Sequence, residues 1–211
     1  MGGLTPRPHD LLRLSSASAL SCTDDAGTIR ARTVATVGGQ TWVVVRRAEP
    51  VGGRIPVGIR GTKRSERYAT TVAGDDVVEV VSPPQIHTVP VPQRAGLPAF
   101  RTLADTRHAL ATHPFASRWG PGGSVGFELV TGAPAVIETS DLDIVIDAPT
   151  PLSRNTARYF LDGVADRPAH VDVQVATPLG GFALREWLRD DHGLVALRTA
   201  HGPVRTASPW G

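Results

Sequence analysis

The sequence predicts an α/β fold, in the broad sense that includes α+β, with a small β-rich N-terminal domain and a C-terminal domain built on a mixed sheet. Two observations support this. Prolines at positions 83, 84, 90, 92 and 98 forbid a regular helix or a central strand there. Strand-like runs dominate before this break, and strand-like and helix-like runs alternate after it. We therefore expect domains at 1–82 and 99–211, joined by an extended proline-rich linker at 83–98.

The N-terminal domain reads as a series of short strands. A β-branched run at residues 41–47 predicts a strand, and Gly52 with Gly53 predicts a turn after it. Residues 55–61 form a shorter, interrupted strand pattern, and the valine-rich residues 77–81 form another.

In the C-terminal domain, segments with the periodicity of a strand alternate with segments with the periodicity of a helix. Leucines and alanines at helical spacing predict a helix at residues 103–111. The elements expected after it are a strand at 141–147, a helix at 153–161, a strand at 171–175, a helix at 183–189 and a strand at 194–199. Ser153 is a candidate helix cap. This order indicates a small mixed sheet.

Composition narrows the class of protein. The chain has 211 residues, 41% hydrophobic and 20% charged, which is typical of a globular protein. No apolar run is long enough to span a bilayer, and the N-terminus lacks the layout of a signal peptide. A net charge of +2 is too even for non-specific nucleic-acid binding. We expect a cytoplasmic protein with neither a nucleic-acid nor a membrane partner.

Two aspartates, Asp141 and Asp143, fall on one predicted strand. Alternate side chains of a strand share a face, so these carboxylates start roughly 6–7 Å apart at the backbone. Burying both costs desolvation and repulsion, which a hard cation such as Mg²⁺ or Mn²⁺ would remove. A metal site is the prediction, and an acidic pair facing solvent at a strand end is the alternative.

A third aspartate, Asp172, lies between valines in the predicted strand at 171–175. If this strand lies beside the first, Asp172 completes a three-carboxylate cluster. Metal ions held there could clamp the attacking and leaving oxygens of a phosphoryl transfer. The alternative is an ordinary half-exposed strand residue.

A glycine-rich segment at residues 122–126 precedes the aspartates. A turn at Gly123 would expose backbone N–H groups to a phosphate, and Ser124 could add its hydroxyl, although Ser124 is nearly as well explained as a small turn-former. The segment also fits the Gly-x-Ser-x-Gly elbow of serine hydrolases. That elbow needs a strand before the serine, and residues 117–121 are a poor strand pattern, so the hydrolase reading is disfavoured.

The ordered trio of a Gly-Ser turn, an Asp-x-Asp strand and a lone aspartate resembles the nucleotidyltransferase superfamily. A closer resemblance runs over nearly the whole chain. Its motifs are Arg-Pro-His-Asp-Leu-Leu from residue 7, Pro-Val-Gly-Ile-Arg-Gly from 56, Gly-Ser-Val-Gly-Phe-Glu-Leu-Val-Thr-Gly from 123, Ser-Asp-Leu-Asp from 140, and Arg198-Thr, Gly202-Pro and Pro209-Trp210 near the end. In this order they resemble the phosphoribosyl-dephospho-CoA transferase family of malonate decarboxylase, the holo-acyl-carrier-protein synthases.

The resemblance implies an activity. The enzyme would take 2'-(5''-triphosphoribosyl)-3'-dephospho-CoA and attach its phosphoribosyl-dephospho-CoA unit to a serine of the apo acyl-carrier subunit, releasing pyrophosphate. Asp141 and Asp143 would hold metal, and Asp172 would ligate one metal and help deprotonate the serine. The cofactor would be Mg²⁺ or Mn²⁺.

A basic run in the N-terminal domain is a second candidate phosphate contact. Arg60, Lys63 and Arg64 follow what we expect to be a turn at residues 58–61, and one or two of them would bind the triphosphate. A solvated charged face is equally well supported. Two other functions stay open: a nucleotidyltransferase-fold enzyme with another acceptor, and a non-catalytic binding module.

Overall fold

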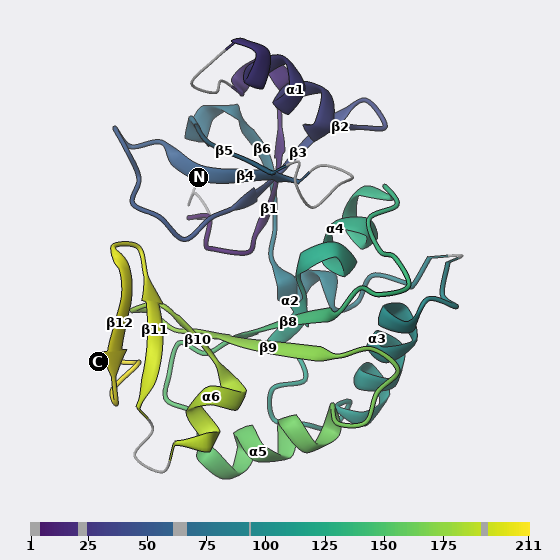
Figure 1. The fold of residues 1–211 in the computed structure, drawn as a ribbon, viewed down its shortest axis with the longest axis vertical. Coiled ribbons are helices and arrows are strands. Elements are labelled where there is room, and N and C mark those ends of the chain that lie inside the picture. Colours follow the sequence, from purple (N-terminus) through teal and green to yellow (C-terminus); the bar gives the residue numbers. More distant parts are fainter. Residues whose placement is uncertain (1–4, 21–24, 61–66, 93, 191–193) are drawn as a thin grey trace. The chain divides into compact units, whose positions relative to one another are not determined.

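The computed structural model describes residues 5–20, 25–60, 67–92, 94–190 and 194–211. The chain divides into two compact units, Met1–Ser82 and Pro83–Gly211, coloured purple to blue and teal to yellow in Figure 1. Each unit has its own sheet and its own hydrophobic core. In the described part of the chain, no helix is both long and apolar enough to cross a membrane.

The first unit is built on a six-stranded sheet with the order β5-β4-β3-β1-β6, in which β2 also pairs with β3. Its strands, all paired antiparallel, are β1 (Leu11–Leu14), β2 (Thr36–Val37), β3 (Gln40–Val45), β4 (Ile55–Arg60), β5 (Arg67–Val72) and β6 (Val77–Val81). The β-rich character, the three predicted strands and the turn at Gly52 and Gly53, both at positive φ, are confirmed.

Several elements of this unit, among them β1, β5 and α1, are absent from the prediction. The strand β1 is only four residues long and has leucines on both faces, so it shows no clear alternation. The edge strand β5 is largely polar. The helix α1 (Asp25–Ala35) contains glycine and β-branched residues that disfavour helices. It forms because Ala31 and Ala35 are buried against the sheet, where α1 contacts β3 and β4.

The segment predicted as an extended linker, residues 83–98, is not extended at its start. Pro83–Ile86 form a one-turn helix, α2, and Pro98 begins α3 (Pro98–Ala109). Proline fits the first turn of a helix because the N–H groups there have no partner within the helix. Ile86 is buried, and α2 packs on β7 (Trp119–Pro121). Pro83 and Pro98 therefore begin helices instead of excluding them, whereas Pro90 and Pro92 lie in neither a helix nor a strand.

The second unit has a six-stranded mixed sheet with the order β12-β11-β10-β9-β8-β7. After β7 its strands are β8 (Leu142–Asp147), β9 (Val171–Ala176), β10 (Gly181–Ala183), β11 (Val195–Thr199) and β12 (Gly202–Thr206). Only the β8–β9 pair is parallel among the described pairings, as expected for strands joined through a helix. The predicted mixed sheet is confirmed.

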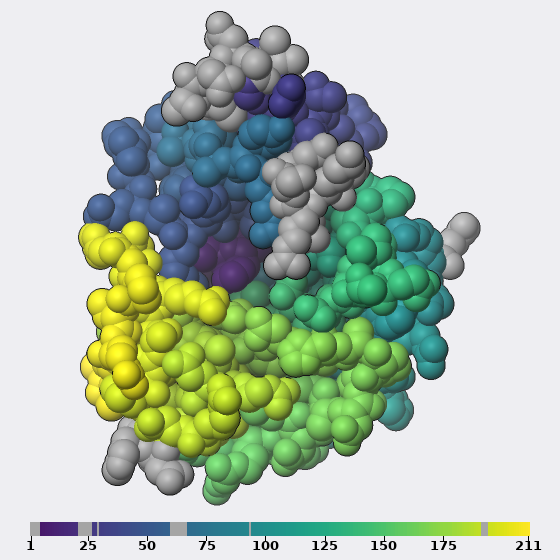
Figure 2. All heavy atoms as spheres, viewed as in Figure 1, coloured from purple at the N-terminus to yellow at the C-terminus, as the bar shows by residue number. Residues whose placement is uncertain are grey.

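One face of this sheet is covered by helices. In Figure 1, α3, α5 (Arg154–Gly163) and α6 (Leu184–Arg189) lie on the same side of the sheet. Leu142, Ile144 and Val173 are buried on that side with Phe100 of α3 and Phe160 of α5. The opposite face carries the alternate residues of β8 and β9, among them two of the predicted site aspartates, Asp143 and Asp172. In Figure 2 the yellow C-terminal residues, which include the edge strand β12, lie at the surface.

Most predicted elements of this unit are confirmed. Ser153 caps α5, since its Oγ accepts a hydrogen bond from the N–H of Thr156. The helix predicted at 103–111 starts earlier, at Pro98. The strand β7 and the helix α4 (Gly123–Thr131) were not predicted, because glycine and proline are poor formers of both elements.

Candidate active site

Two of the predicted site residues lie directly opposite each other. In the parallel β8–β9 pair, Asp143 is in register with Asp172, so both side chains leave the same face of the sheet. Each is half-buried. The neighbouring partners Leu142 and Val171 are buried on the other face. The expectation that Asp172 lies beside the strand of Asp143 is therefore correct.

The carboxylate of Asp143 lies against the backbone of Gly123. A Cβ atom on Gly123 would be 1.8 Å from Oδ2 of Asp143, far inside van der Waals contact. Gly123 also has φ +53°, a conformation that side chains disfavour. Glycine is required here on two independent grounds. The negative carboxylate lies at the N-terminal end of α4, where the helix dipole favours it.

The glycine-rich segment is the start of a helix that a strand precedes. The N-cap is Gly122, and its N–H donates to the carbonyl oxygen of Asp143 at 2.9 Å. The strand β7 comes directly before, so the expectation of a poor strand at 117–121 is wrong. Residues with low strand propensity form β7 because Trp119 is fully buried and pairs with Ile146 of β8.

The strand–turn–helix order agrees with the nucleophile elbow of serine hydrolases, but the position of Ser124 does not. A nucleophile elbow presents its serine at a strained, exposed turn. Here Gly123 holds the strained position, and Ser124 lies inside the first turn of α4 with only 5% of its surface exposed. The same burial leaves the phosphate contact of Ser124 a prediction and favours the backbone of the turn over its hydroxyl.

The third aspartate, Asp141, is set apart from the pair. It is exposed and lies one residue before β8 begins. Among the described residues, no group of three or more His, Cys, Asp or Glu side chains could hold a metal ion. The three-carboxylate site therefore stays a prediction, whose preformed part is Asp143 with Asp172.

This pair fits a hard divalent cation by its chemistry. Mg²⁺ is usually bound through one or two carboxylates, and water and substrate phosphates complete its octahedral shell. Asp143 and Asp172 supply two oxygen donors from adjacent strands of one sheet face. Two like charges in register are also destabilising unless something compensates them. The donor set therefore suits Mg²⁺ or Mn²⁺.

Polar residues that the sequence did not single out continue along the same face. The amide of Gln174 donates from Nε2 to Oδ2 of Asp172 at 3.3 Å. Its Oε1 accepts a hydrogen bond from Nη1 of Arg198, on β11, at 3.2 Å. Alternation along β9 places Gln174 on the face of Asp172, but no sequence pattern indicates the contact to Arg198.

The predicted basic run belongs to the first unit. Arg60 ends β4 and pairs with Arg67 of β5, and Gly58 lies within β4, so the turn expected at 58–61 does not begin at Gly58. Lys63 and Arg64 lie outside the described residues. Their contact with phosphate stays a prediction.

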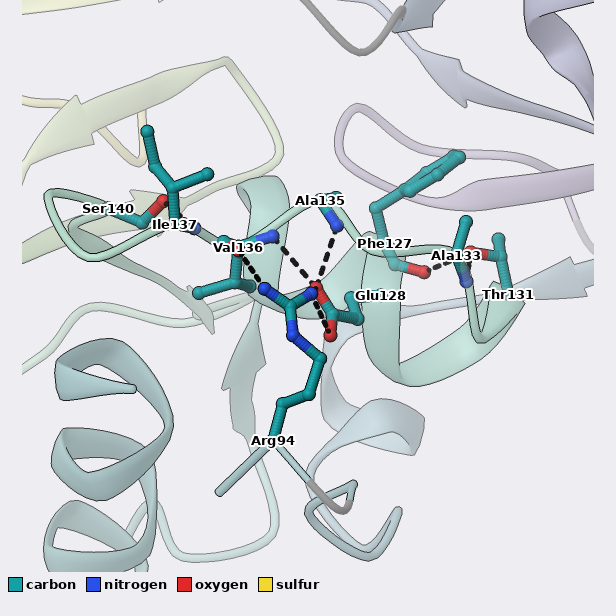
Figure 3. A network of polar contacts seen from close by, with 9 residues as sticks. All are labelled: Arg94, Phe127, Glu128, Thr131, Ala133, Ala135, Val136, Ile137 and Ser140. Atoms are coloured by element: carbon teal, nitrogen blue, oxygen red, sulfur yellow. Dashed lines mark hydrogen bonds and ion pairs between the residues drawn. The ribbon is translucent and has the colours of Figure 1, made fainter. Parts of the chain in front are cut away.

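A buried glutamate fixes the loop that connects α4 to β8. Figure 3 shows Glu128 at the centre of this network. Its Oε2 accepts from the N–H groups of Ala135 and Val136 at 2.7 and 2.8 Å, and Arg94 donates to both carboxylate oxygens at 3.0 and 3.2 Å. Arg94 also donates to the carbonyl of Val136 at 2.8 Å. Glu128 thus ties α4, which carries Gly123, to the loop that leads into β8.

Two histidines, the buried His113 and the half-buried His87, contact only structural groups in the described part of the chain. The N–H of Phe115 donates to Nδ1 of His113 at 3.0 Å, which leaves Nε2 to donate to the carbonyl of Thr156 at 3.1 Å. Burial lowers the pKa of His113 below its ordinary value. Burial, and then repulsion by Arg107, lowers the pKa of His87. Both histidines are therefore neutral near pH 7.

Comparisons with known proteins cover both units. The chain matches the model of the phosphoribosyl-dephospho-CoA transferase MdcG N-terminal domain over residues 7–83 and that of the C-terminal domain over residues 88–209. A phosphoribosyl-dephospho-CoA transferase of Klebsiella pneumoniae (strain 342) is 42% identical, with 98% of this chain and 97% of the relative covered. A phosphoribosyl-dephospho-CoA transferase of Pseudomonas syringae pv. tomato is 38% identical, with 96% of this chain and 92% of the relative covered. No solved structure gives a significant match.

Proposed function

The chain belongs to the phosphoribosyl-dephospho-CoA transferase family, and on this premise we propose which group it transfers and to what acceptor. The donor is 2'-(5''-triphosphoribosyl)-3'-dephospho-CoA, and the acceptor is a serine of the apo acyl-carrier subunit of malonate decarboxylase. The observation that carries the proposal is the in-register pair Asp143 and Asp172 beside the glycine turn of α4, in a chain whose two halves both match the family.

The proposed reaction exchanges a phosphoanhydride bond for a phosphate ester bond at the α-phosphorus. The serine Oγ of the carrier forms a bond to the α-phosphorus of the donor's triphosphate. The bond from that phosphorus to the oxygen bridging the α- and β-phosphates breaks, and pyrophosphate leaves with its electron pair. The hydroxyl proton passes to a base. The α-phosphate stays in the product as the diester that joins the serine to the ribose.

The residues of the pair take distinct roles in this scheme. Asp143, with Asp141 two residues before it, would hold the divalent cation, which when bound neutralises charge on the phosphates and the leaving pyrophosphate. Asp172 would share the cation and accept the serine proton, as a positioned carboxylate can. Gly123 sets the backbone of the turn against Asp143, and Glu128 fixes the loop that leads into β8.

Phosphate contacts are proposed at the glycine turn and at the basic run. The first N–H groups of α4, next to Gly123 and Ser124, have no partner within the helix and favour anions. Arg60, Lys63 and Arg64 are proposed as further contacts because the donor carries a triphosphate and arginine binds phosphate through two parallel N–H groups.

The direct test is mass spectrometry of the carrier. Apo carrier is incubated with the enzyme, magnesium and the triphosphate donor, and pyrophosphate release is measured in parallel. The proposal expects one phosphoribosyl-dephospho-CoA unit on the carrier serine and one pyrophosphate for each unit added. A carrier in which the acceptor serine is alanine is the control and should stay unmodified. Modification of a citrate lyase-type carrier in preference to this one would transfer the proposal to another acceptor.

A further inference from the structure

A chain of two hydrogen bonds crosses the face of the C-terminal sheet that α3, α5 and α6 leave uncovered. It runs from Oδ2 of Asp172 to Nε2 of Gln174 at 3.3 Å, and from Oε1 of Gln174 to Nη1 of Arg198 at 3.2 Å. The first two residues are half-buried and Arg198 is exposed. A cation on β11 is thereby linked to the carboxylate pair on β8 and β9.

Arg198 reaches Gln174 across an intervening strand, and the sequence of that strand permits it. In β10, Gly181 pairs with Arg198 on one side and with Ala176 on the other, and Ala183 pairs with Gln174. Residues paired across strands share a face. The face of β10 below the arginine therefore carries only a hydrogen and a methyl group, over which a long side chain can lie.

The charges at its two ends fix the orientation of the Gln174 amide. Its NH₂ group faces the carboxylate of Asp172, and its carbonyl oxygen faces the guanidinium of Arg198. The flipped amide would set two acceptors against each other at one end and two donors at the other. Gln174 therefore holds Arg198 at a defined distance from Asp172 and keeps the two from closing into an ion pair.

This arrangement leaves the arginine able to bind an anion. A guanidinium has five N–H donors, and the described contact to Gln174 engages only Nη1. Arg198 is exposed on the sheet face that carries Asp143 and Asp172. In the proposed reaction, negative charge accumulates on the pyrophosphate that leaves the α-phosphorus. A planar, permanently charged fork suits two oxygens of such a group.

We propose that Arg198 binds the β- and γ-phosphates of the triphosphate donor, which leave as pyrophosphate, and that Gln174 is the positioning residue that aims it. The inference rests on the proposed function for the identity of the donor. It gives a substrate-binding role to the arginine of the motif near the end of the chain, and it places a phosphate contact in the same unit as the aspartates.

The first experiment is calorimetric titration of the full-length protein with inorganic pyrophosphate in the presence of magnesium. Arg198→Ala should weaken binding about tenfold or more, the loss expected for one charge-assisted contact to phosphate, and Arg198→Lys should recover part of it. Arg158→Ala is the matched control, because Arg158 is an exposed arginine on α5, which packs on the opposite face. Equal affinity in wild type and Arg198→Ala, or no binding by wild type, overturns the inference.

The second experiment separates positioning from simple packing. Gln174→Ala should weaken pyrophosphate binding and slow transfer, since it loses both contacts. Gln174→Glu keeps the size of the side chain but pairs Arg198 with a carboxylate and sets that carboxylate against Asp172, so pyrophosphate affinity and kcat should both fall. Wild-type affinity and kcat in Gln174→Glu, with both lowered in Gln174→Ala, would leave Gln174 only a packing role and overturn its part of the proposal.

Transfer kinetics distinguish this inference from the proposed function. Arg198→Ala should raise the KM for the triphosphate donor and leave the KM for the carrier unchanged. If wild type transfers nothing to the carrier, the proposed function fails, whatever the titration shows. If wild type transfers normally and Arg198→Ala has an unchanged KM for the donor, only the role of Arg198 fails.

Discussion

Gly123 and Asp143 fit so closely that a methyl group on Gly123 would lie 1.8 Å from Oδ2 of Asp143. The contact joins the first turn of α4 to β8, the two elements that carry the candidate phosphate site and the candidate metal site. One substitution therefore tests whether the two sites work as a unit.

We expect Gly123→Ala to abolish transfer and to lower the free energy of unfolding. Its backbone has φ +53°, which costs a side chain about 1–2 kcal/mol, and the new Cβ must also displace the Asp143 carboxylate. The matched control is Gly132→Ala at the other end of α4, with φ +71° and nothing within 4 Å of the new atom. That variant has the strain without the clash, so denaturant unfolding should show a smaller loss and transfer should continue. Equal effects of the two substitutions would contradict the linkage.

Removing one charge of the aspartate pair should separate stability from activity. Asp172→Asn keeps an oxygen for Gln174 but removes the like charge in register with Asp143. Without divalent cation, the variant should be more stable than wild type by about 0.5 kcal/mol. Transfer should fall by about 100-fold or more, because a positioned base is lost. Asp162→Asn, an exposed aspartate on α5, is the control and should change neither quantity. Normal turnover by Asp172→Asn would remove this residue from the mechanism.

The predicted metal can be detected without any turnover. Because a ligand that binds only the folded protein stabilises it, Mg²⁺ or Mn²⁺ should raise the Tm of wild type, with a gain that grows as the logarithm of one plus its concentration over the dissociation constant. Variants Asp141→Ala and Asp143→Ala should show a smaller rise and no transfer. Chelator should abolish wild-type transfer, and added magnesium should restore it. Full activity in excess chelator would refute the metal-dependent scheme.

Replacing one carboxylate oxygen of Glu128 by an amide nitrogen should destabilise the loop between α4 and β8. In Glu128→Gln an amide NH₂ replaces one carboxylate oxygen, so at least one donor among Arg94 and the N–H groups of Ala135 and Val136 loses its acceptor. We expect a loss of about 1–3 kcal/mol in the free energy of unfolding. Glu138→Gln, an exposed glutamate of the same loop, is the control and should be neutral. Urea denaturation of both variants decides whether the carboxylate supports the loop.

The sequence predicts the face on which the carboxylates lie but not their register. Strand alternation places the side chains of Asp143 and Leu142 on opposite faces of the sheet, and the valines on both sides of Asp172 indicate that it lies in a strand. The two aspartates lie directly opposite each other because of the register between β8 and β9. Burial of the apolar residues of both strands sets this register, and it does so only in the folded chain.

The parts that sequence reasoning missed depend on tertiary packing. The helix α4 has glycines at positions 123 and 126, which are poor helix formers, yet a Cβ on Gly126 would lie 2.5 Å from the carbonyl oxygen of Pro121. Close packing therefore requires a residue that local propensity disfavours. The contact of Gln174 with Arg198 joins residues 24 positions apart across a third strand, and no local periodicity records such a pair.

The stability of the second unit should fall as the solution becomes acidic. Burial lowers the folded-state pKa of His113 below the value of about 6.5 that histidine has in the unfolded chain. Between these two values the unfolded chain binds more protons than the folded one, so stability is complete above about pH 6.5 and is lost as the pH falls toward the folded pKa. Protonation also removes the acceptor that Nδ1 offers to the N–H of Phe115.

The measurement is the free energy of unfolding, from urea titrations between pH 7.5 and 5, for wild type and two variants. His113→Asn should be less stable than wild type at pH 7.5 but lose less stability on acidification, because the buried His113 no longer titrates. The slope that remains belongs in part to His87, whose pKa is also lowered, by burial and then by Arg107. His170→Asn, at an exposed position, should follow the wild-type curve. If His113→Asn keeps the full wild-type slope, the acid sensitivity arises elsewhere in the chain.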